Sequence, residues 1–304
     1  MQFSSENRAR IQLLLAALLF STGGTAIKAC TLSGWQVASF RSGIAALALL
    51  AFLPESRPFR QPGAWTPRAL LASVAYAATL VSFVLANKLT SAANAIFLQA
   101  TAPLYLLVLS PLVLREKIRR PDIAVFCCVG LGAILLMTAS HPTDTGTSPS
   151  ELGNMIGLAS GFFWAWTLIG MRWLAKRGGS AGTAEATVAA GNVLSFAACL
   201  PMALAAGFAL SGKDTAILLY LGIFQIGLAY VLLVKSVRRL PALQVGTLLL
   251  AEPMFNPVWA WVFQGERPGA RVIAGGLAIV GGAFAGTVWT ARDAAASNAS
   301  LTSA

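Results

Sequence analysis

The chain has 304 residues, of which 57% are hydrophobic and only 11% are charged, whereas roughly a quarter of an ordinary soluble domain is charged. This composition excludes a soluble enzyme of a familiar type. The 22 Lys and Arg outnumber the 11 Asp and Glu and give a formal net charge of +11, but they are too sparse to form a nucleic-acid-binding face. The partner that fits such a chain is a lipid bilayer.

Ten apolar runs follow one another along the chain, each close to the roughly 20 residues that a helix needs to cross the hydrocarbon. They cover residues 11–30, 35–53, 69–87, 93–114, 122–139, 153–174, 184–206, 215–236, 242–263 and 270–290. The first run resembles a secretory signal, but because further apolar runs follow it throughout the chain we interpret residues 1–30 as the first span. The sequence therefore predicts an all-α integral membrane protein with ten transmembrane helices.

The basic residues divide unequally between the two sides of these ten spans. With a cytoplasmic N-terminus, sixteen Lys and Arg lie on the cytoplasmic side and one, Arg41, lies within a span. The other side receives Lys28, Lys88, Lys213, Arg267 and Arg271. By the positive-inside rule, we expect a multi-pass protein of the cell (inner) membrane with both termini in the cytoplasm.

The two halves of the chain repeat each other. At an offset of 150 residues, Pro103 aligns with Pro253 and Glu116 aligns with Glu266, and further pairs keep the same order. Because each half holds five spans, an odd number, the second half must enter the membrane inverted. We expect a first repeat in residues 1–143 with spans 1–5, and a second in residues 144–304 with spans 6–10. The second repeat is expected to end in a disordered tail from about residue 293.

The second half carries a recognisable pattern. Residues 239–255 read RLPALQVGTLLLAEPMF, and Gly265-Glu266 and a glycine-rich last span follow. This pattern resembles the EamA repeat of the drug/metabolite transporter superfamily, over about 11–139 and 152–290. Within it, the chain looks most like the YddG-type exporters of aromatic and other neutral amino acids. The resemblance implies a ten-span carrier of small metabolites, with any role of Glu252 confined to the second half because Ala102 occupies the matching position.

Two charged residues lie inside predicted spans. Glu252 is expected near the bilayer centre, where it serves either in proton coupling or ammonium binding, or as a structural acid that caps backbone groups freed by Pro253. Arg41 lies about 9 Å from the outer end of its span, at 1.5 Å per residue. It either attracts a carboxylate in a cavity or snorkels and donates to carbonyls, and the pattern favours snorkelling.

Further polar and aromatic residues lie at similar depth in the predicted spans. Each taken singly fits helix packing, but as a group they favour a site for a small amphipathic substrate. With Glu252, the predicted substrate-binding residues are Tyr76, Thr79, Phe83, Gln99, Trp164, Gln225 and Tyr230. We expect them in a cavity lined by spans three, four, eight and nine, with Pro103 and Pro253 as hinges.

No grouping of residues predicts catalysis. His141 lies in a polar loop without partners, and the four cysteines have no metal-site spacing, so we expect no catalytic residue, metal or cofactor. The GxxxG pattern Gly282–Gly286 suits a helix contact within the monomer or a weak dimer seam.

These observations predict an inner-membrane secondary transporter that exports small amphipathic metabolites by alternating access, with aromatic and other neutral amino acids as the leading class. The alternatives are a drug or other metabolite carrier of the same superfamily, a membrane-embedded lipid-modifying enzyme, and a channel.

Overall fold

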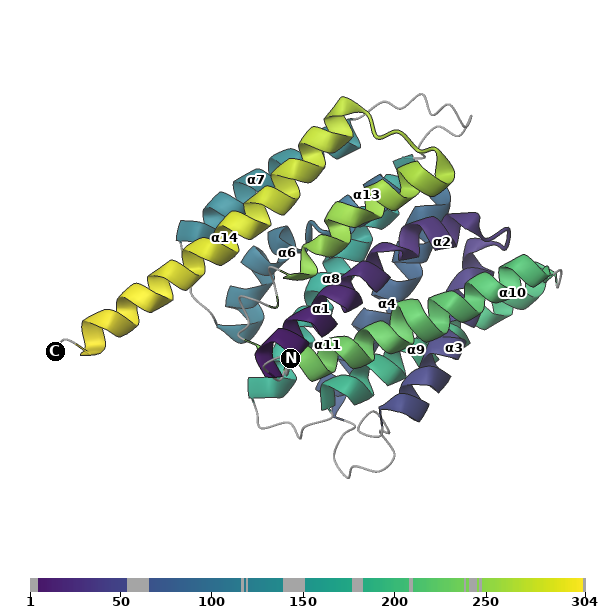
Figure 1. Cartoon of the computed structure of the whole chain (residues 1–304), viewed down its shortest axis with the longest axis horizontal. Coiled ribbons are helices and arrows are strands. Elements are labelled where there is room, and N and C mark those ends of the chain that lie inside the picture. Colours follow the sequence, from purple (N-terminus) through teal and green to yellow (C-terminus); the bar gives the residue numbers. More distant parts are fainter. Residues whose placement is uncertain are drawn as a thin grey trace.

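The computed structural model shows a bundle of helices (Figure 1). It describes residues 5–53, 66–115, 118, 120–138, 151–176, 183–207, 210–237, 239–240, 245 and 248–302, and none of these lies in a strand. The first half contains α1 (Ser5–Ser21), α2 (Gly23–Ala29), α3 (Gly34–Phe52), α4 (Pro67–Leu89), α5 (Ala92–Gln99), α6 (Ala102–Leu109), the π-helix η3 (Ser110–Leu114) and α7 (Arg120–Met137). The second half contains α8 (Glu151–Lys176), α9 (Thr183–Ala205), α10 (Gly212–Leu219), the π-helix η4 (Tyr220–Leu228), α11 (Ala229–Val237), α13 (Ala251–Gln264) and α14 (Ala270–Thr302).

Seven helical stretches of the described chain are long and apolar enough to cross a membrane. They are Glu6–Ala29, Gly34–Phe52, Pro67–Leu89, Ala92–Leu114, Glu151–Met171, Glu185–Ala205 and Gly212–Leu233. Two shorter apolar helices, Asp122–Met137 and Ala270–Gly286, match the fifth and tenth predicted spans. For the ninth, α13 provides 14 described residues. The chain is thus an all-helical membrane protein, and the count of ten spans stays a prediction.

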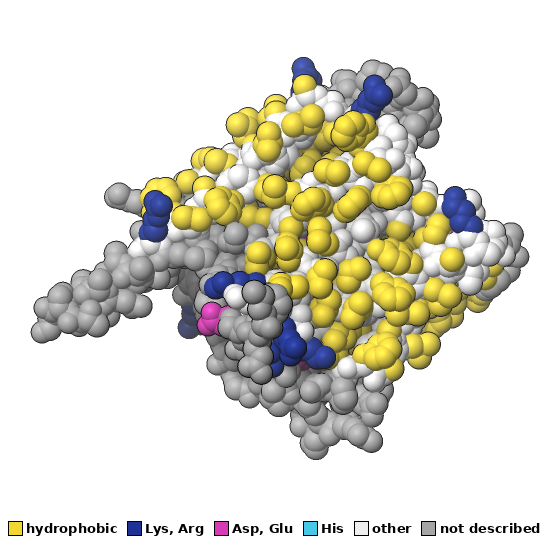
Figure 2. Space-filling view, in the orientation of Figure 1, with side chains coloured by type: hydrophobic (Ala, Val, Ile, Leu, Met, Phe, Trp, Pro, Cys, Tyr) yellow, Lys and Arg dark blue, Asp and Glu magenta, His cyan; other side chains and the backbone are white. Residues whose placement is uncertain are grey.

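The exterior of the bundle is apolar. Large side chains such as Leu112, which is 73% exposed, and Leu277 and Phe263 lie open on the helix surfaces. Figure 2 shows one such face, where hydrophobic side chains form a broad continuous area and the few Lys and Arg lie toward its margins. Apolar surface this extensive is typical of a protein that contacts lipid.

Hydroxyl caps fix where several helices begin. The side chains of Ser33, Thr66, Ser91 and Ser211 each accept a hydrogen bond from the backbone N–H three residues later. Such caps satisfy donors that the first helical turn leaves unpaired, which matters because lipid offers no alternative partner.

The predicted hinge prolines lie at the starts of helices inside the bundle. The fourth span is broken at Ala100 and Thr101, and α6 begins there with Pro103 near its N-terminus. Pro253 lies in the first turn of α13. Each proline therefore occupies a position where its missing N–H costs little, and each follows an interruption that can absorb bending. Their role as hinges stays a prediction.

One expectation about the C-terminus differs from the structure. The sequence predicted a disordered tail from about residue 293, whereas α14 continues to Thr302 and projects beyond the bundle (Figure 1). The segment is rich in alanine, the residue with the highest helix propensity, so it extends the helix that precedes it. Residues 139–150, which include His141, and residues 116–117 lie outside the described chain.

Glycines set the close contact between α7 and α14, which lie side by side at one edge of the bundle (Figure 1). A Cβ added to Gly132 would lie 2.6 Å from the carbonyl oxygen of Gly275, and a Cβ added to Gly275 would lie 2.8 Å from that of Gly132. The predicted GxxxG pair faces the same helix, because Gly282 packs against Cys128 and Gly286 against Val125. The pattern thus serves a contact within the chain.

This geometry gives a test of stability. Gly132→Ala and Gly275→Ala should each destabilise the protein by about 1–3 kcal/mol, because the added methyl group forces the two backbones apart. Gly281→Ala is the matched control on α14, since no described atom of another helix lies within 4 Å of its added Cβ. Thermal unfolding in detergent would measure the difference, and equal Tm values for all three variants would contradict the close-packing account.

Candidate functional site

A cavity of about 130 Å³ lies inside the bundle, and residues from both halves of the chain line it. All eight predicted substrate-binding residues are in its wall: Tyr76, Thr79, Phe83, Gln99, Trp164, Gln225, Tyr230 and Glu252. The remaining lining residues, which the sequence did not single out as a substrate-binding set, are Phe20, Arg41, Leu80, Ile226, Leu233 and Leu249. The cavity suits a small ligand, because drug-sized ligands occupy roughly 300–1,000 Å³.

More helices contribute to this cavity than the sequence predicted. Spans three, four, eight and nine supply most of the wall, as expected. Phe20 of α1, Arg41 of α3 and Trp164 of α8 add spans one, two and six. The sequence predicts Trp164 because its indole N–H is a polar group deep within a span. Phe20 is one apolar residue among many in the first run, so the sequence does not distinguish it. Periodicity within one helix does not show which helices meet around a common space.

Aromatic rings form one side of the cavity. Tyr230 of α11 makes edge contacts with Phe20, at 5.1 Å between ring centroids, and with Tyr76, at 5.7 Å. Edge-to-face pairs at these distances stabilise each other and hold the rings in fixed orientations. The cavity can therefore offer aromatic faces and edges to an apolar or aromatic ligand without first having to order them.

Polar side chains line other parts of the same wall. The Gln99 amide donates to the Ser160 hydroxyl at 2.9 Å, which holds it against α8. The Gln225 amide donates to the Phe20 carbonyl at 3.5 Å, and its oxygen has no described donor. Gln225 lies in the π-helix η4, and such widened turns occur often at functional sites because they redirect a side chain.

Thr79 is less available than the sequence suggested. Its hydroxyl donates to the Ala75 carbonyl at 2.9 Å within α4, and it lies 3.4 Å from the Thr167 hydroxyl of α8. The side chain thus satisfies its own helix and ties α4 to α8. It can still accept a hydrogen bond from a ligand, since a hydroxyl oxygen has two lone pairs.

Arg41 does not snorkel, contrary to the interpretation that its position in the sequence favoured. Its side chain is 1% exposed and forms part of the cavity wall. The expected hydrogen bond to a carbonyl is present, from Nη2 to Leu80 at 3.4 Å. The sequence places a residue along its helix but does not say around which face the neighbouring helices close, and that face decided the direction of this side chain.

Glu252 lies in the first turn of α13 and faces the cavity. A helix N-terminus favours negative charge, so this position suits a carboxylate within the membrane. Among described residues the structure shows no hydrogen bond from the Glu252 side chain to the backbone and no ion pair between Glu252 and Arg41. The capping role that the sequence left open is therefore not seen in the described part of the chain.

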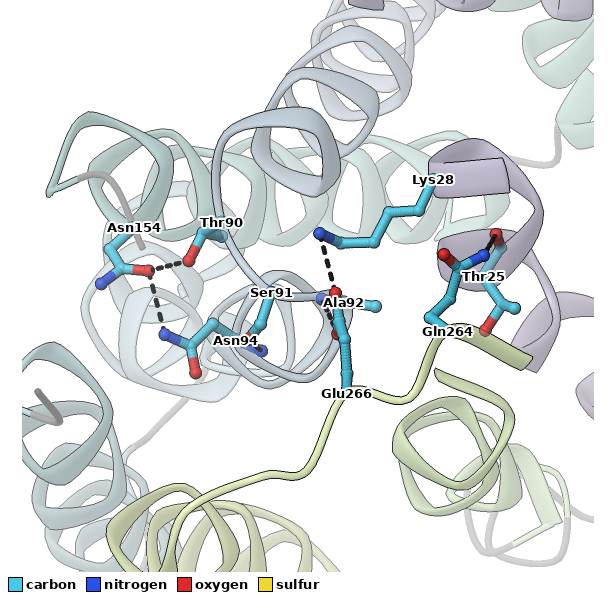
Figure 3. A network of polar contacts seen from close by, with 9 residues as sticks. All are labelled: Thr25, Lys28, Thr90, Ser91, Ala92, Asn94, Asn154, Gln264 and Glu266. Carbon is cyan, nitrogen blue, oxygen red and sulfur yellow. Dashed lines mark hydrogen bonds and ion pairs between the residues drawn. The ribbon is translucent and has the colours of Figure 1, made fainter. Parts of the chain in front are cut away.

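Polar contacts close the bundle at the end opposite the N-terminus. Lys28 of α2 pairs with Glu266 at 2.8 Å, and Glu266 also accepts from the backbone N–H of Ala92 at 3.0 Å (Figure 3). Nearby, the Gln264 amide donates to the Thr25 carbonyl at 3.1 Å. These contacts join α2 and α5 of the first half to the end of α13 and the segment that follows it in the second half.

Two further groups of contacts strengthen the same end. Asn154 of α8 accepts hydrogen bonds from Thr90 at 2.7 Å and from Asn94 at 3.1 Å (Figure 3). Asp214 of α10 accepts from the backbone N–H and the hydroxyl of Thr31, at 2.7 and 2.6 Å. Each group links the two halves. Near the N-terminus, Ala9, Leu13 and Leu240 form an apolar cluster.

Comparison with known proteins assigns the chain to a family. The EamA-like transporter family matches residues 8–138 and again 151–287. The chain is 26% identical to an uncharacterized transporter of Archaeoglobus fulgidus, over 83% of this chain and 87% of that protein. It is also 26% identical to the pseudopaline exporter of Pseudomonas aeruginosa, over 88% of this chain and 91% of the exporter.

A solved structure shares the fold. One crystal structure superposes with a TM-score of 0.64 at 20% identity and covers 95% of this chain and 99% of its own. The chain belongs to the EamA-like transporter family. The broader resemblance found in the sequence is thereby confirmed, and the narrower one to YddG-type exporters stays a prediction.

The polar closure can be tested by chemical labelling. Lys28→Met and Glu266→Gln should each make the cavity more accessible from the side opposite the N-terminus, because each removes the ion pair between the halves. With a pair worth about 0.5–1 kcal/mol, the labelling rate should rise about two- to fivefold. The probe is Phe83→Cys, labelled by a membrane-impermeant maleimide in a background that lacks the native thiols of Cys30, Cys127, Cys128 and Cys199.

Glu6→Gln provides the control, since it breaks the exposed pair with Arg10 at the other end. It should leave the labelling rate unchanged. An unaltered rate in both Lys28→Met and Glu266→Gln would mean that the ion pair does not hold this end closed.

Proposed function

We propose that this member of the EamA-like transporter family is an inner-membrane exporter of small amphipathic metabolites. Its leading substrates are aromatic and other neutral amino acids, moved by alternating access. The observation that carries the proposal is one cavity inside the bundle, shared by both halves, which combines aromatic rings, amides and two charged groups. Such a lining suits a ligand with an apolar part and a polar, charged part.

Alternating access is supported by the polar contacts that close one end of the bundle. The end opposite the N-terminus is held by the Lys28–Glu266 pair and its neighbouring hydrogen bonds. On the other side, the cavity wall extends along α11 to Leu233. If both termini are cytoplasmic, as the basic residues indicate, this arrangement corresponds to a state that loads substrate from the cytoplasm, which suits export.

Ten spans in two inverted repeats account for the helix contacts. In two five-span repeats, span 1 corresponds to span 6, span 2 to span 7, and so on. Each pair of packed helices should therefore have a corresponding pair. The packing of α4 on α8 then corresponds to that of α1 on α11, and the packing of α3 on η4 corresponds to that of α9 on α4. Contact of α5 with α8 corresponds to contact of α13 with α1. The two separate stretches that match the family support the same division, with repeats in residues 1–143 and 144–304.

The name of one relative supports export as the direction. The protein of Pseudomonas aeruginosa that aligns with 88% of this chain is a pseudopaline exporter. Neither this name nor the cavity requires an enzymatic step, so the lipid-modifying enzyme is less favoured. A drug carrier of the same superfamily is the nearest alternative.

Counterflow in proteoliposomes tests the transport mode. Vesicles loaded with unlabelled phenylalanine should accumulate external labelled phenylalanine, and uptake should saturate, because a carrier exchanges substrate through one occluded site. Flux that does not saturate would indicate a channel, and chemical change of added lipid would indicate an enzyme. Tyr230→Leu should weaken phenylalanine exchange about two- to tenfold, since a ring contact is worth about 0.5–1.5 kcal/mol.

Tyr105→Leu is the matched control. Tyr105 also makes an edge contact, with Phe162 at 5.5 Å, but it lies outside the cavity. Its replacement should leave the apparent affinity for phenylalanine unchanged. An equal loss of affinity in both variants would point to a general effect on packing.

Tags on the two termini test the topology. Both should be accessible from the cytoplasm, because ten spans return the chain to the side where it began. A tag inserted after residue 145 should be accessible only from the opposite side. Protease protection in intact cells and inverted vesicles measures this, and termini on opposite sides of the membrane would overturn the ten-span count.

A further inference from the structure

Arg41 is the largest side chain that the described structure buries almost completely. A guanidinium keeps its charge under all ordinary conditions, and burying it without an anion is costly, all the more so within a membrane. A buried guanidinium therefore needs an anion or several hydrogen-bond acceptors close to it.

The described chain supplies little compensation. One of the five N–H donors of Arg41 reaches the Leu80 carbonyl, at 3.4 Å, and its Nε has no described acceptor. No described carboxylate lies within ion-pair distance of it. The packing therefore leaves a planar fork of donors at the cavity wall, which is the arrangement that binds a carboxylate in bidentate fashion.

A carboxyl group lies elsewhere in the same wall. Glu252 faces the cavity from α13 and does not pair with Arg41. Tyr76 and Tyr230 line the same cavity and contact each other through their rings, at 5.7 Å between centroids. The cavity wall thus combines a cationic group, a carboxyl group and aromatic surface.

We propose that Arg41 binds the carboxylate of the transported substrate and Glu252 its cationic group, while the aromatic rings contact its apolar part. This inference rests on the proposed function and makes it more specific. It assigns zwitterions with an apolar or aromatic side chain as substrates and excludes amines and lipophilic cations that lack a carboxylate. The amino-acid carrier is thereby favoured over the drug carrier, because a cation without an anionic group leaves Arg41 uncompensated.

Three compounds that share one ring separate the two charges: phenylalanine, phenethylamine without the carboxylate, and 3-phenylpropanoate without the ammonium. In the wild-type protein, phenylalanine should inhibit labelled-phenylalanine counterflow at concentrations at least about tenfold lower than either analogue. Arg41→Gln should abolish the preference over phenethylamine, and Glu252→Gln should abolish the preference over 3-phenylpropanoate. A general loss of folding does not produce these opposite changes in selectivity.

Arg41→Lys keeps the positive charge, so it tests the assignment even if Arg41→Gln does not fold. It should raise the KM for phenylalanine with less effect on kcat, and keep the order of the three compounds, because lysine retains the charge but loses the fork. Arg10→Gln, on the exposed part of α1, is the matched control and should change nothing. If Arg41→Gln still prefers phenylalanine to phenethylamine, the carboxylate binds elsewhere and the proposal is wrong.

A binding measurement separates failure of this inference from failure of the proposed function. The Tm of the purified protein is followed with each of the three compounds and with ethidium, a lipophilic cation. Stabilisation by phenylalanine that Arg41→Gln removes supports the assignment of Arg41 even if counterflow is absent. Stabilisation and transport of ethidium, with no effect of any carboxylate, would overturn the assignment while leaving a transporter of another substrate class.

Discussion

Charge inside a membrane has to be compensated by the protein or by what it carries, and this constraint organises the structure. Arg41 and Glu252 lie in one cavity without pairing with each other, although both are surrounded by an apolar bundle. Placing them apart is costly for the empty protein, because each charge loses hydration. In the proposed mode of binding, a ligand with both opposite charges compensates both groups. A ligand that lacks one charge leaves a buried group without a partner and should bind more weakly.

The remainder of the bundle is held by two kinds of contact. The helices α7 and α14 approach so closely at Gly132 and Gly275 that no side chain fits between them. The closed end is held differently, by the Lys28–Glu266 pair, whose side chains are 20% and 13% exposed, and by a few hydrogen bonds. Individually such partly exposed contacts are worth little to stability.

Broken helices connect the cavity to these contacts. The helix α2, which carries Lys28, is separated from α1 at Thr22, and the fourth span is interrupted before Pro103. A short helical segment joined to its neighbour by an interruption can change direction with few lost hydrogen bonds.

The sequence by itself determined that the chain is helical and lies in a membrane, which family it belongs to, and which polar residues lie at depth. These properties depend on composition, on the length of apolar runs and on residues that stand near one another in the chain. The eight predicted residues, including Tyr76, Gln225 and Glu252, share the depth of the cavity for this reason, and helix packing brings them together around it. Only the tertiary structure decided that Arg41 faces the cavity, that Phe20 completes the aromatic wall and that Lys28 meets Glu266 across the halves. Helix packing decides which neighbours surround each face of a helix, and so which partner a side chain contacts. The pattern of apolar runs in the sequence does not specify that packing.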